Sequence, residues 1–257
     1  MNDGYAELEF DLPRALLKDI VALLDGMNSA ELTTSNLTGV SDAPGVYALS
    51  SSVTGELLYI GKAESSKGLL NRLTRHMRKL DGRQNINPGD IHFKAVRIFV
   101  FAAMDLEAAL ISHYGGDGKL PWNHSGFGSN DPGQQRDTTT YKPDHFDTQH
   151  PIRLDHSFVE FKVGQRPVAE VMQHLKDGLP YLLRFQRPNA SSRNSFESDF
   201  EDNIVDIQRP HMTTREVLEL CVAALPSGWH ATALPSHVIF YKNDDRRFPS
   251  GTLIARS

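Results

Sequence analysis

The sequence predicts an α/β protein, more narrowly one of the α+β class, and three observations support this prediction. Two short apolar runs, 46–49 and 57–60, flank a polar stretch with Thr54-Gly55, which is typical of a β-hairpin. A basic segment with helical periodicity follows the hairpin, and another apolar run follows that segment. Beyond residue 154, a helical pattern followed by a strand pattern occurs twice.

The composition is that of a globular protein and argues against several classes. The 257 residues carry a net charge of −5, which disfavours a protein that coats nucleic acid over its whole surface. The longest wholly apolar run, 98–104, is far too short for a membrane span, and no secretory leader pattern opens the chain. The single cysteine, Cys221, excludes an internal disulfide, and its apolar helical pattern predicts a buried thiol. We therefore expect a cytoplasmic protein without a membrane partner.

Residues 1–39 are expected to form an N-terminal helical arm. Asp11 is a predicted N-cap, Pro13 suits the first turn, and helical periodicity then continues to Gly26. The apolar face of this helix has two interpretations, because it can pack on the rest of the chain or contact a nucleic acid or second subunit. We prefer packing.

The segment after the hairpin is strongly basic, with seven Lys or Arg and two Asp or Glu over 62–83. A helix is predicted over 69–79, and Arg72 and His76, four residues apart, share one of its faces. Taken alone, such a patch is most simply a solvated helix face, but its place directly after the hairpin also makes it a candidate nucleic-acid contact. The candidate phosphate-binding residues are Lys62, Lys67, Arg75, Arg78 and, later in the chain, Arg136.

A strand over 91–101, a helix over 104–114 and a long loop follow. Glu107 lies in the first turn of this helix, where its simplest role is to balance the helix dipole. The loop over 115–144 has no periodicity and contains Asn123 and a glycine-rich stretch. An irregular stretch of this length is usually functional or disordered.

Two tripeptides and three single residues in this region resemble the motifs of the GIY-YIG nuclease superfamily. Gly45-Val46-Tyr47 is similar to the first tripeptide, with valine in place of the usual isoleucine, and Tyr59-Ile60-Gly61 matches the second. The arginine, glutamate and asparagine of the family match Arg72, Glu107 and Asn123. Each motif alone is weak, but their order and their placement on helix, strand and loop make the resemblance specific.

The resemblance covers about residues 40–150 and is strongest to the type II restriction-endonuclease branch. His76, one turn after the arginine, and the Gly-Phe-Gly-Ser-Asn-Asp-Pro-Gly stretch at 126–133 are similar to that branch. The assignment of the asparagine to Asn123 stays open, because Asn130 lies in the same loop.

The resemblance implies a nuclease core over 40–153, with a small antiparallel sheet flanked by helices. It implies hydrolysis of phosphodiester bonds in double-stranded DNA with Mg²⁺, for which Mn²⁺ substitutes. Glu107 is then the metal ligand, which suits an ion that keeps most of its waters. Asn123 is expected to orient Glu107 or a bound water.

The resemblance also assigns roles to the remaining residues. Tyr47 is expected to take a proton from the attacking water, and Tyr59 to orient the water or the phosphate. Arg72 is expected to contact a non-bridging phosphate oxygen, and His76 to hydrogen-bond the tyrosine or the phosphate.

The expected activity is that of a site-specific restriction endonuclease. Because one such core makes one cut, double-strand cleavage predicts a homodimer over a palindromic site. A cognate methyltransferase acting on the same site is a possible partner. The alternatives are a less specific defence or repair nuclease, or a non-catalytic DNA-binding protein on the same fold.

Residues 154–257 are predicted to form a separate α+β domain of unknown role. Strands are expected over 158–163, 181–185 and 237–241, and helices over 167–176 and 217–225. Thr213 and Glu216 predict a capping box before the last helix, and the polar stretch 188–210 is expected to be a loop. The domain could recognise DNA sequence, mediate dimerisation or bind another protein.

Overall fold

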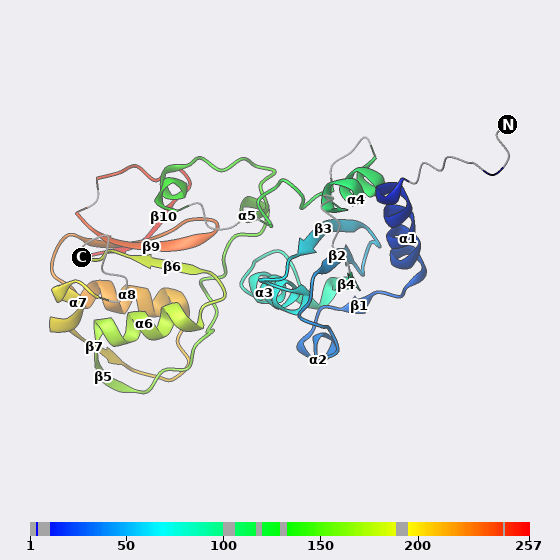
Figure 1. Ribbon diagram of the computed structural model, residues 1–257. Helices are drawn as coiled ribbons and strands as arrows, with labels where there is room; N and C mark the ends of the chain where they lie inside the picture. The colour runs from blue at the N-terminus through cyan, green and yellow to red at the C-terminus, as the bar shows by residue number, and fades with distance from the viewer. Residues whose placement is uncertain are drawn as a thin grey trace. The chain divides into compact units, whose positions relative to one another are not determined.

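The computed structural model describes a mixed protein of helices and small sheets, which confirms the α+β class (Figure 1). The described residues are 4, 11–99, 106–116, 120–128, 133–188, 195–243 and 245–257. They fall into two compact units, one made of 1–77 with 87–124 and one made of 78–86 with 125–257. None of the helices in the described part of the chain is long and apolar enough to cross a membrane.

The first unit contains an antiparallel four-stranded sheet in the order β1-β4-β2-β3. Its strands are β1 (Ala30–Glu31), β2 (Gly45–Ser51), β3 (Leu57–Ala63) and β4 (Ile91–Arg97). The predicted hairpin is confirmed as β2 and β3, in which Tyr47 lies opposite Gly61. The strand predicted over 91–101 ends at Arg97, and its last two residues lie outside the described part of the chain.

Helices cover both faces of this sheet. They are α1 (Leu12–Gly26), α2 (Thr34–Leu37), α3 (Leu69–Asp81), α4 (Leu106–Gly115) and the 3-10 turn η1 (Pro88–Asp90). Apolar side chains of α1 and α4 form one core with Val46, Ala48 and Ile60 of the central hairpin. This confirms the packing interpretation of the N-terminal helix, whose N-cap Asp11 accepts a hydrogen bond from the Arg14 amide at 3.0 Å.

The second unit contains a four-stranded sheet and a two-stranded ribbon. The sheet has the order β10-β8-β9-β6, with β6 and β9 parallel and the other pairs antiparallel. Its strands are β6 (Leu182–Phe185), β8 (Trp229–Ala233), β9 (His237–Lys242) and β10 (Thr252–Arg256), and the ribbon pairs β5 (Gly164–Pro167) with β7 (Ile204–Ile207). The helices are η2 (Gln134–Thr138), α5 (Phe146–Gln149), α6 (Val168–Gly178), α7 (Ser198–Asp202) and α8 (Thr214–Ala224).

The apolar core of this unit lies between the sheet and the helices α6 and α8. The predicted capping box is confirmed, because the Thr213 amide donates to Glu216 Oε2 at 2.8 Å and the Glu216 amide donates to Thr213 Oγ1 at 3.3 Å. Cys221 is fully buried, and burial raises the pKa of its thiol to about 12. The thiol is therefore protonated at neutral pH and serves packing.

Two predictions for this region are wrong. No strand forms over 158–163, where the described backbone makes only an isolated bridge between Glu160 and His211. The stretch 188–210, expected to be a loop, contains α7 and β7 in its described part. Its few apolar residues decide this, because Phe200 is fully buried in the core and Val205 and Ile207 alternate inward along β7.

Residues 125–153 belong to the second unit, whereas the sequence predicts a first domain that extends to residue 153. A buried carboxylate explains the difference. Asp137 is inaccessible to solvent and accepts hydrogen bonds from His237 Nε2 at 2.8 Å and from the Tyr241 hydroxyl at 2.9 Å, with the Arg184 guanidinium also on Oδ1. These bonds attach the segment to β6 and β9, and separating a buried carboxylate from such partners is costly.

Candidate active site

Two tyrosines and a histidine meet on one face of the first sheet. The hydroxyl of Tyr47 lies 2.8 Å from Nε2 of His76, and the ring centroid of Tyr59 lies 6.1 Å from that of Tyr47 and 5.4 Å from that of His76. The three side chains come from β2, α3 and β3, and none is more than 8% exposed. Residues that are far apart in sequence therefore form one polar cluster inside an otherwise apolar interior.

Strand alternation and one glycine place the Tyr47 ring in this cluster. Successive strand residues point to opposite faces, so Tyr47 faces away from the core that contains Val46 and Ala48. Gly61 lies directly opposite, and a Cβ there would come within 2.5 Å of both Cζ and the hydroxyl of Tyr47. The glycine of the second tripeptide is thus required because the aromatic ring occupies the space of its missing side chain.

Glu107 and Arg72 are the charged residues that act on both tyrosines. Burial, followed by the nearby Tyr59 hydroxyl, raises the pKa of Tyr47 far above its usual range, and the Glu107 carboxylate adds to the rise while Arg72 opposes it. Burial and then Glu107 likewise raise the pKa of Tyr59. Both hydroxyls are therefore protonated at neutral pH in the protein without ligands. Tyr47 can act in proton transfer only by giving its own proton to a neighbour, and His76 is within reach.

Arg72 carries an unsatisfied donor at this cluster. Its Nε is buried and has no hydrogen-bond partner among the described residues. Such donors are rare in proteins because each one loses its bonds to water. An anionic oxygen bound beside the tyrosines would supply the missing acceptor.

Among the described residues, Glu107 is the acidic side chain whose charge acts on both tyrosines, and it is the candidate ligand for a metal ion. It is half-buried in the first turn of α4. No group of three or more His, Cys, Asp or Glu side chains suited to a metal occurs in the described ranges. One carboxylate fits Mg²⁺, which keeps several waters and uses few protein ligands, whereas it does not fit a structural zinc site.

The side chain of Asn123 is bonded to the backbone of β3. Its Nδ2 donates to the Ile60 carbonyl and its Oδ1 accepts from the Ile60 amide, both at 2.9 Å, and the side chain is 6% exposed. Each polar atom of Asn123 thus has a hydrogen bond to β3, which holds this side chain on the Ile60 backbone, and its expected role toward Glu107 or a bound water stays a prediction. The Trp122 amide binds the Leu58 carbonyl at 2.9 Å in the same way, so this loop pairs with the outer edge of β3. Asn130 lies outside the described residues.

We expect Asn123→Ala to lower the free energy of unfolding by about 1–3 kcal/mol, because two buried backbone groups of Ile60 lose their partner. The rate of cleavage should fall together with stability, because Ile60 is the residue between Tyr59 and Gly61 and its backbone holds both in the candidate site. Chemical denaturation compares this variant with Asn36→Ala. That control removes a hydrogen bond that a side-chain amide donates to a backbone carbonyl at an exposed position in the same unit. Lost cleavage at unchanged stability would instead favour a direct catalytic role.

The candidate phosphate-binding residues differ in their surroundings. Arg75 and Arg78 are exposed on α3, and Lys67 is exposed in the turn before it. Lys62 is half-buried in β3. These four cations stay candidates for contact with a polyanion, and the charge of Arg75 is near enough to the cluster to oppose the rise that burial causes in the pKa of Tyr59.

Arg136 is committed to an internal network of the second unit, which corrects its assignment as a phosphate ligand. Its Nη2 lies 2.6 Å from Asp147 Oδ2, its Nε donates to the Tyr141 hydroxyl at 2.8 Å, and its side chain is only 15% exposed. Arg83 contacts the other oxygen of the same carboxylate at 3.0 Å. Because breaking a buried ion pair is costly, Arg136 serves the structure of this unit.

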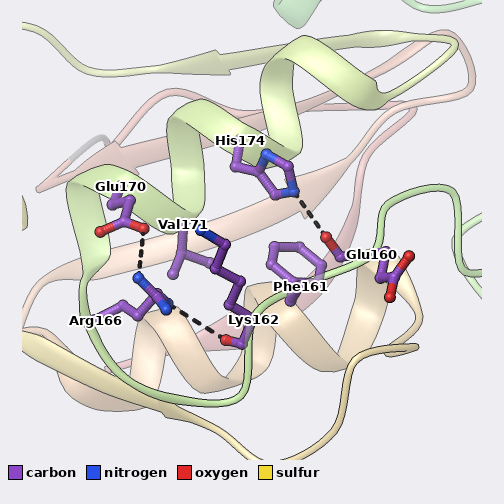
Figure 2. A pocket seen from close by; sticks show the side chains of 7 residues that line it. All are labelled: Glu160, Phe161, Lys162, Arg166, Glu170, Val171 and His174. Carbon is purple, nitrogen blue, oxygen red and sulfur yellow. Dashed lines mark hydrogen bonds and ion pairs between the residues drawn. The ribbon is translucent and has the colours of Figure 1, made fainter.

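A pocket of about 280 Å³ lies in the second unit beside α6 (Figure 2). It is lined by Glu160, Phe161, Lys162, Arg166, Glu170, Val171 and His174. Arg166 is paired with Glu170 at 2.9 Å, and His174 Nε2 lies 2.9 Å from the Glu160 carbonyl oxygen. Figure 2 marks both contacts with dashed lines. Cations and anions thus balance each other here, which gives the pocket no preference for an anionic ligand.

Comparison with protein-family models gives no match for this chain, and comparison with curated proteins gives none either.

Proposed function

We propose that the protein is a Mg²⁺-dependent endonuclease that hydrolyses phosphodiester bonds of double-stranded DNA on a GIY-YIG-type core. The observation that carries the proposal is the buried cluster of Tyr47, Tyr59 and His76, with Arg72 and Glu107 acting on it. These five residues are those that the motif resemblance selects, and a packing role alone does not require two tyrosines, a histidine and two opposite charges to meet.

The hydrolysis can be followed proton by proton. The attacking water gives a proton to the Tyr47 oxygen while its own oxygen forms the new bond to phosphorus. Tyr47 passes its original proton to His76 Nε2, 2.8 Å away, so no tyrosinate with an unfavourable pKa has to accumulate. The bond between phosphorus and the 3′ oxygen breaks, and that oxygen takes a proton from solvent.

Arg72 is the residue that would stabilise charge on the phosphate. Its buried, unpartnered Nε supplies a donor for a non-bridging oxygen, and the cost of that unsatisfied group disappears when substrate binds. Tyr59, packed against both Tyr47 and His76, holds their rings in place and can orient the water.

Glu107 would hold the metal ion, together with water molecules. A bound Mg²⁺ or Mn²⁺ supplies charge stabilisation to the phosphate and to the departing oxygen. The Glu107 carboxylate, placed by the first turn of α4, is the protein's contribution to this site.

The finer assignment is a type II restriction endonuclease that acts as a homodimer, with a cognate methyltransferase protecting the same site. It rests on the resemblance of His76 and of the 126–133 stretch to that branch. Within this stretch, residues 129–132 lie outside the described part of the chain. A less specific defence or repair nuclease is the second candidate. The second unit, which packs as a compact body of its own, is the candidate element for sequence recognition.

The test is a digest of unmethylated plasmid and phage DNA with Mg²⁺ or with a chelator. We expect discrete fragments only with the metal, and a loss of about 10²–10³-fold in Arg72→Ala, as for removal of one preorganised donor. Arg14→Ala, an exposed arginine on α1, is the matched control. A metal-dependent smear would favour the less specific nuclease, and DNA binding without cleavage in Mg²⁺ or Mn²⁺ would favour a non-catalytic DNA-binding protein.

A further inference from the structure

An arginine and an exposed phenylalanine stack at the end of β4. The Arg97 guanidinium lies over the Phe99 ring, 4.3 Å from its centroid. Phe99 is 83% exposed, more than the other large apolar residues of the described chain, and Arg97 is exposed as well. No ion pair between described residues uses the Arg97 charge.

This pair lies on the same side of the sheet as the candidate active site. Arg97 is opposite Gly45 in the β2–β4 register, and Ala95 is opposite Tyr47. Residues directly opposite each other, and residues two apart in a strand, share one face. Arg97 therefore projects from the face that carries Tyr47.

The end of the strand is well anchored. The Ile98 amide donates to the Pro44 carbonyl at 3.0 Å, which continues the pairing beyond Arg97. The pair is therefore presented by a backbone that is held directly beside the first tripeptide. A lone exposed apolar residue needs no explanation, but an exposed ring stacked under an exposed cation on the face of the candidate active site combines the two features that nucleic acids bind.

We propose that Arg97 and Phe99 form a contact for duplex DNA next to the scissile phosphate, with Arg97 on the backbone and Phe99 against the bases. This rests on the function proposed above and adds a contact that the motif residues do not include. Phosphates take up the cation, and an aromatic side chain stacks on bases or wedges between them. The partial opening of a base step by Phe99 would bend the duplex at the site of the cut.

Binding can be measured without cleavage in the Glu107→Gln background, by fluorescence anisotropy of a labelled duplex at several salt concentrations. We expect Arg97→Ala to reduce the slope of log affinity against log salt by about one, as for one lost phosphate contact. Phe99→Ala should weaken binding about tenfold, within the range of lost base stacking, and should leave that slope unchanged. Val53→Ala, which truncates a 73% exposed side chain in the β2–β3 turn, should bind like the parent.

A duplex with 2-aminopurine tests the contact with bases directly. The fluorescence increase on binding, which reports unstacking, should be lost in Phe99→Ala and kept in Arg97→Lys. The inference is overturned if Phe99→Ala and Arg97→Ala bind as Val53→Ala does, or if Phe99→Ala changes only self-association. These outcomes are independent of cleavage, so a wild-type protein that binds but does not cut would remove the proposed cleavage and the place of this pair beside a cut, and would leave the contact of Arg97 and Phe99 with duplex DNA.

Discussion

Replacement of Glu107 by Gln is expected to lower the rate of DNA cleavage by on the order of 10³-fold, since a bound metal supplies several kcal/mol of charge stabilisation. The substitution keeps the size of the side chain and removes its charge. DNA binding should persist, because Arg72 and the exposed cations of α3 are unchanged. The measurement is a single-turnover cleavage assay with Mg²⁺, accompanied by the binding assay on the same duplex.

The same substitution has a readout that does not depend on catalysis. Burial is the main cause of the raised pKa of Tyr59, and the Glu107 carboxylate adds to it, so removal of the carboxylate should lower the pKa of Tyr59 in an NMR titration of the tyrosine rings. Glu56→Gln, an exposed acid near the hairpin turn, is the matched control for both assays. Wild-type cleavage rates in Glu107→Gln would contradict the assignment of the metal site.

Replacement of Tyr47 by Phe is expected to lower single-turnover cleavage by about 10²–10⁴-fold, the usual contribution of a positioned proton-transfer group. The variant keeps the ring that fills the space over Gly61 but loses the hydroxyl bonded to His76. A cost of about 1–3 kcal/mol in stability is also expected, because a buried imidazole nitrogen loses its partner. Thermal unfolding gives that cost separately.

Tyr114→Phe separates chemistry from stability in this experiment. The Tyr114 hydroxyl donates to Asp25 at 2.7 Å in the same unit, away from the candidate site, so the variant also loses one tyrosine hydrogen bond. It should cleave like the wild type. Equal losses in the two variants would mean that Tyr47 acts only through packing, and the proton relay to His76 would have to be abandoned.

Local sequence signals were sufficient for the hairpin, for α3 and for the choice of most cluster residues. The turn between two apolar runs specifies β2 and β3, and the four-residue spacing places Arg72 and His76 on one helix face. The motif tripeptides then identify Tyr47 and Tyr59. These features could be predicted because each depends on residues within one turn or one hairpin of each other.

The sequence does not show the partners of polar residues when those partners lie far away along the chain. Asn123 has a polar side chain of a type common in active sites, yet its Nδ2 and Oδ1 both hydrogen-bond the backbone of Ile60, 63 residues earlier. Arg136 has the charge of a phosphate ligand but is paired with Asp147. Sequence patterns show what a side chain can bind, and only packing decides which partner it has.

The sequence by itself determined the α+β class, the main helices and the residue types of the candidate site. Only the tertiary structure decided that the Tyr47 ring lies where a side chain at Gly61 would be, and that the Tyr47 hydroxyl is hydrogen-bonded to His76. It also decided that Asp137 attaches 125–153 to the second unit. The physical reason is burial. Taking a hydroxyl, an imidazole or a carboxylate out of water is tolerated only where other elements supply its partners, and those elements meet only in the folded chain.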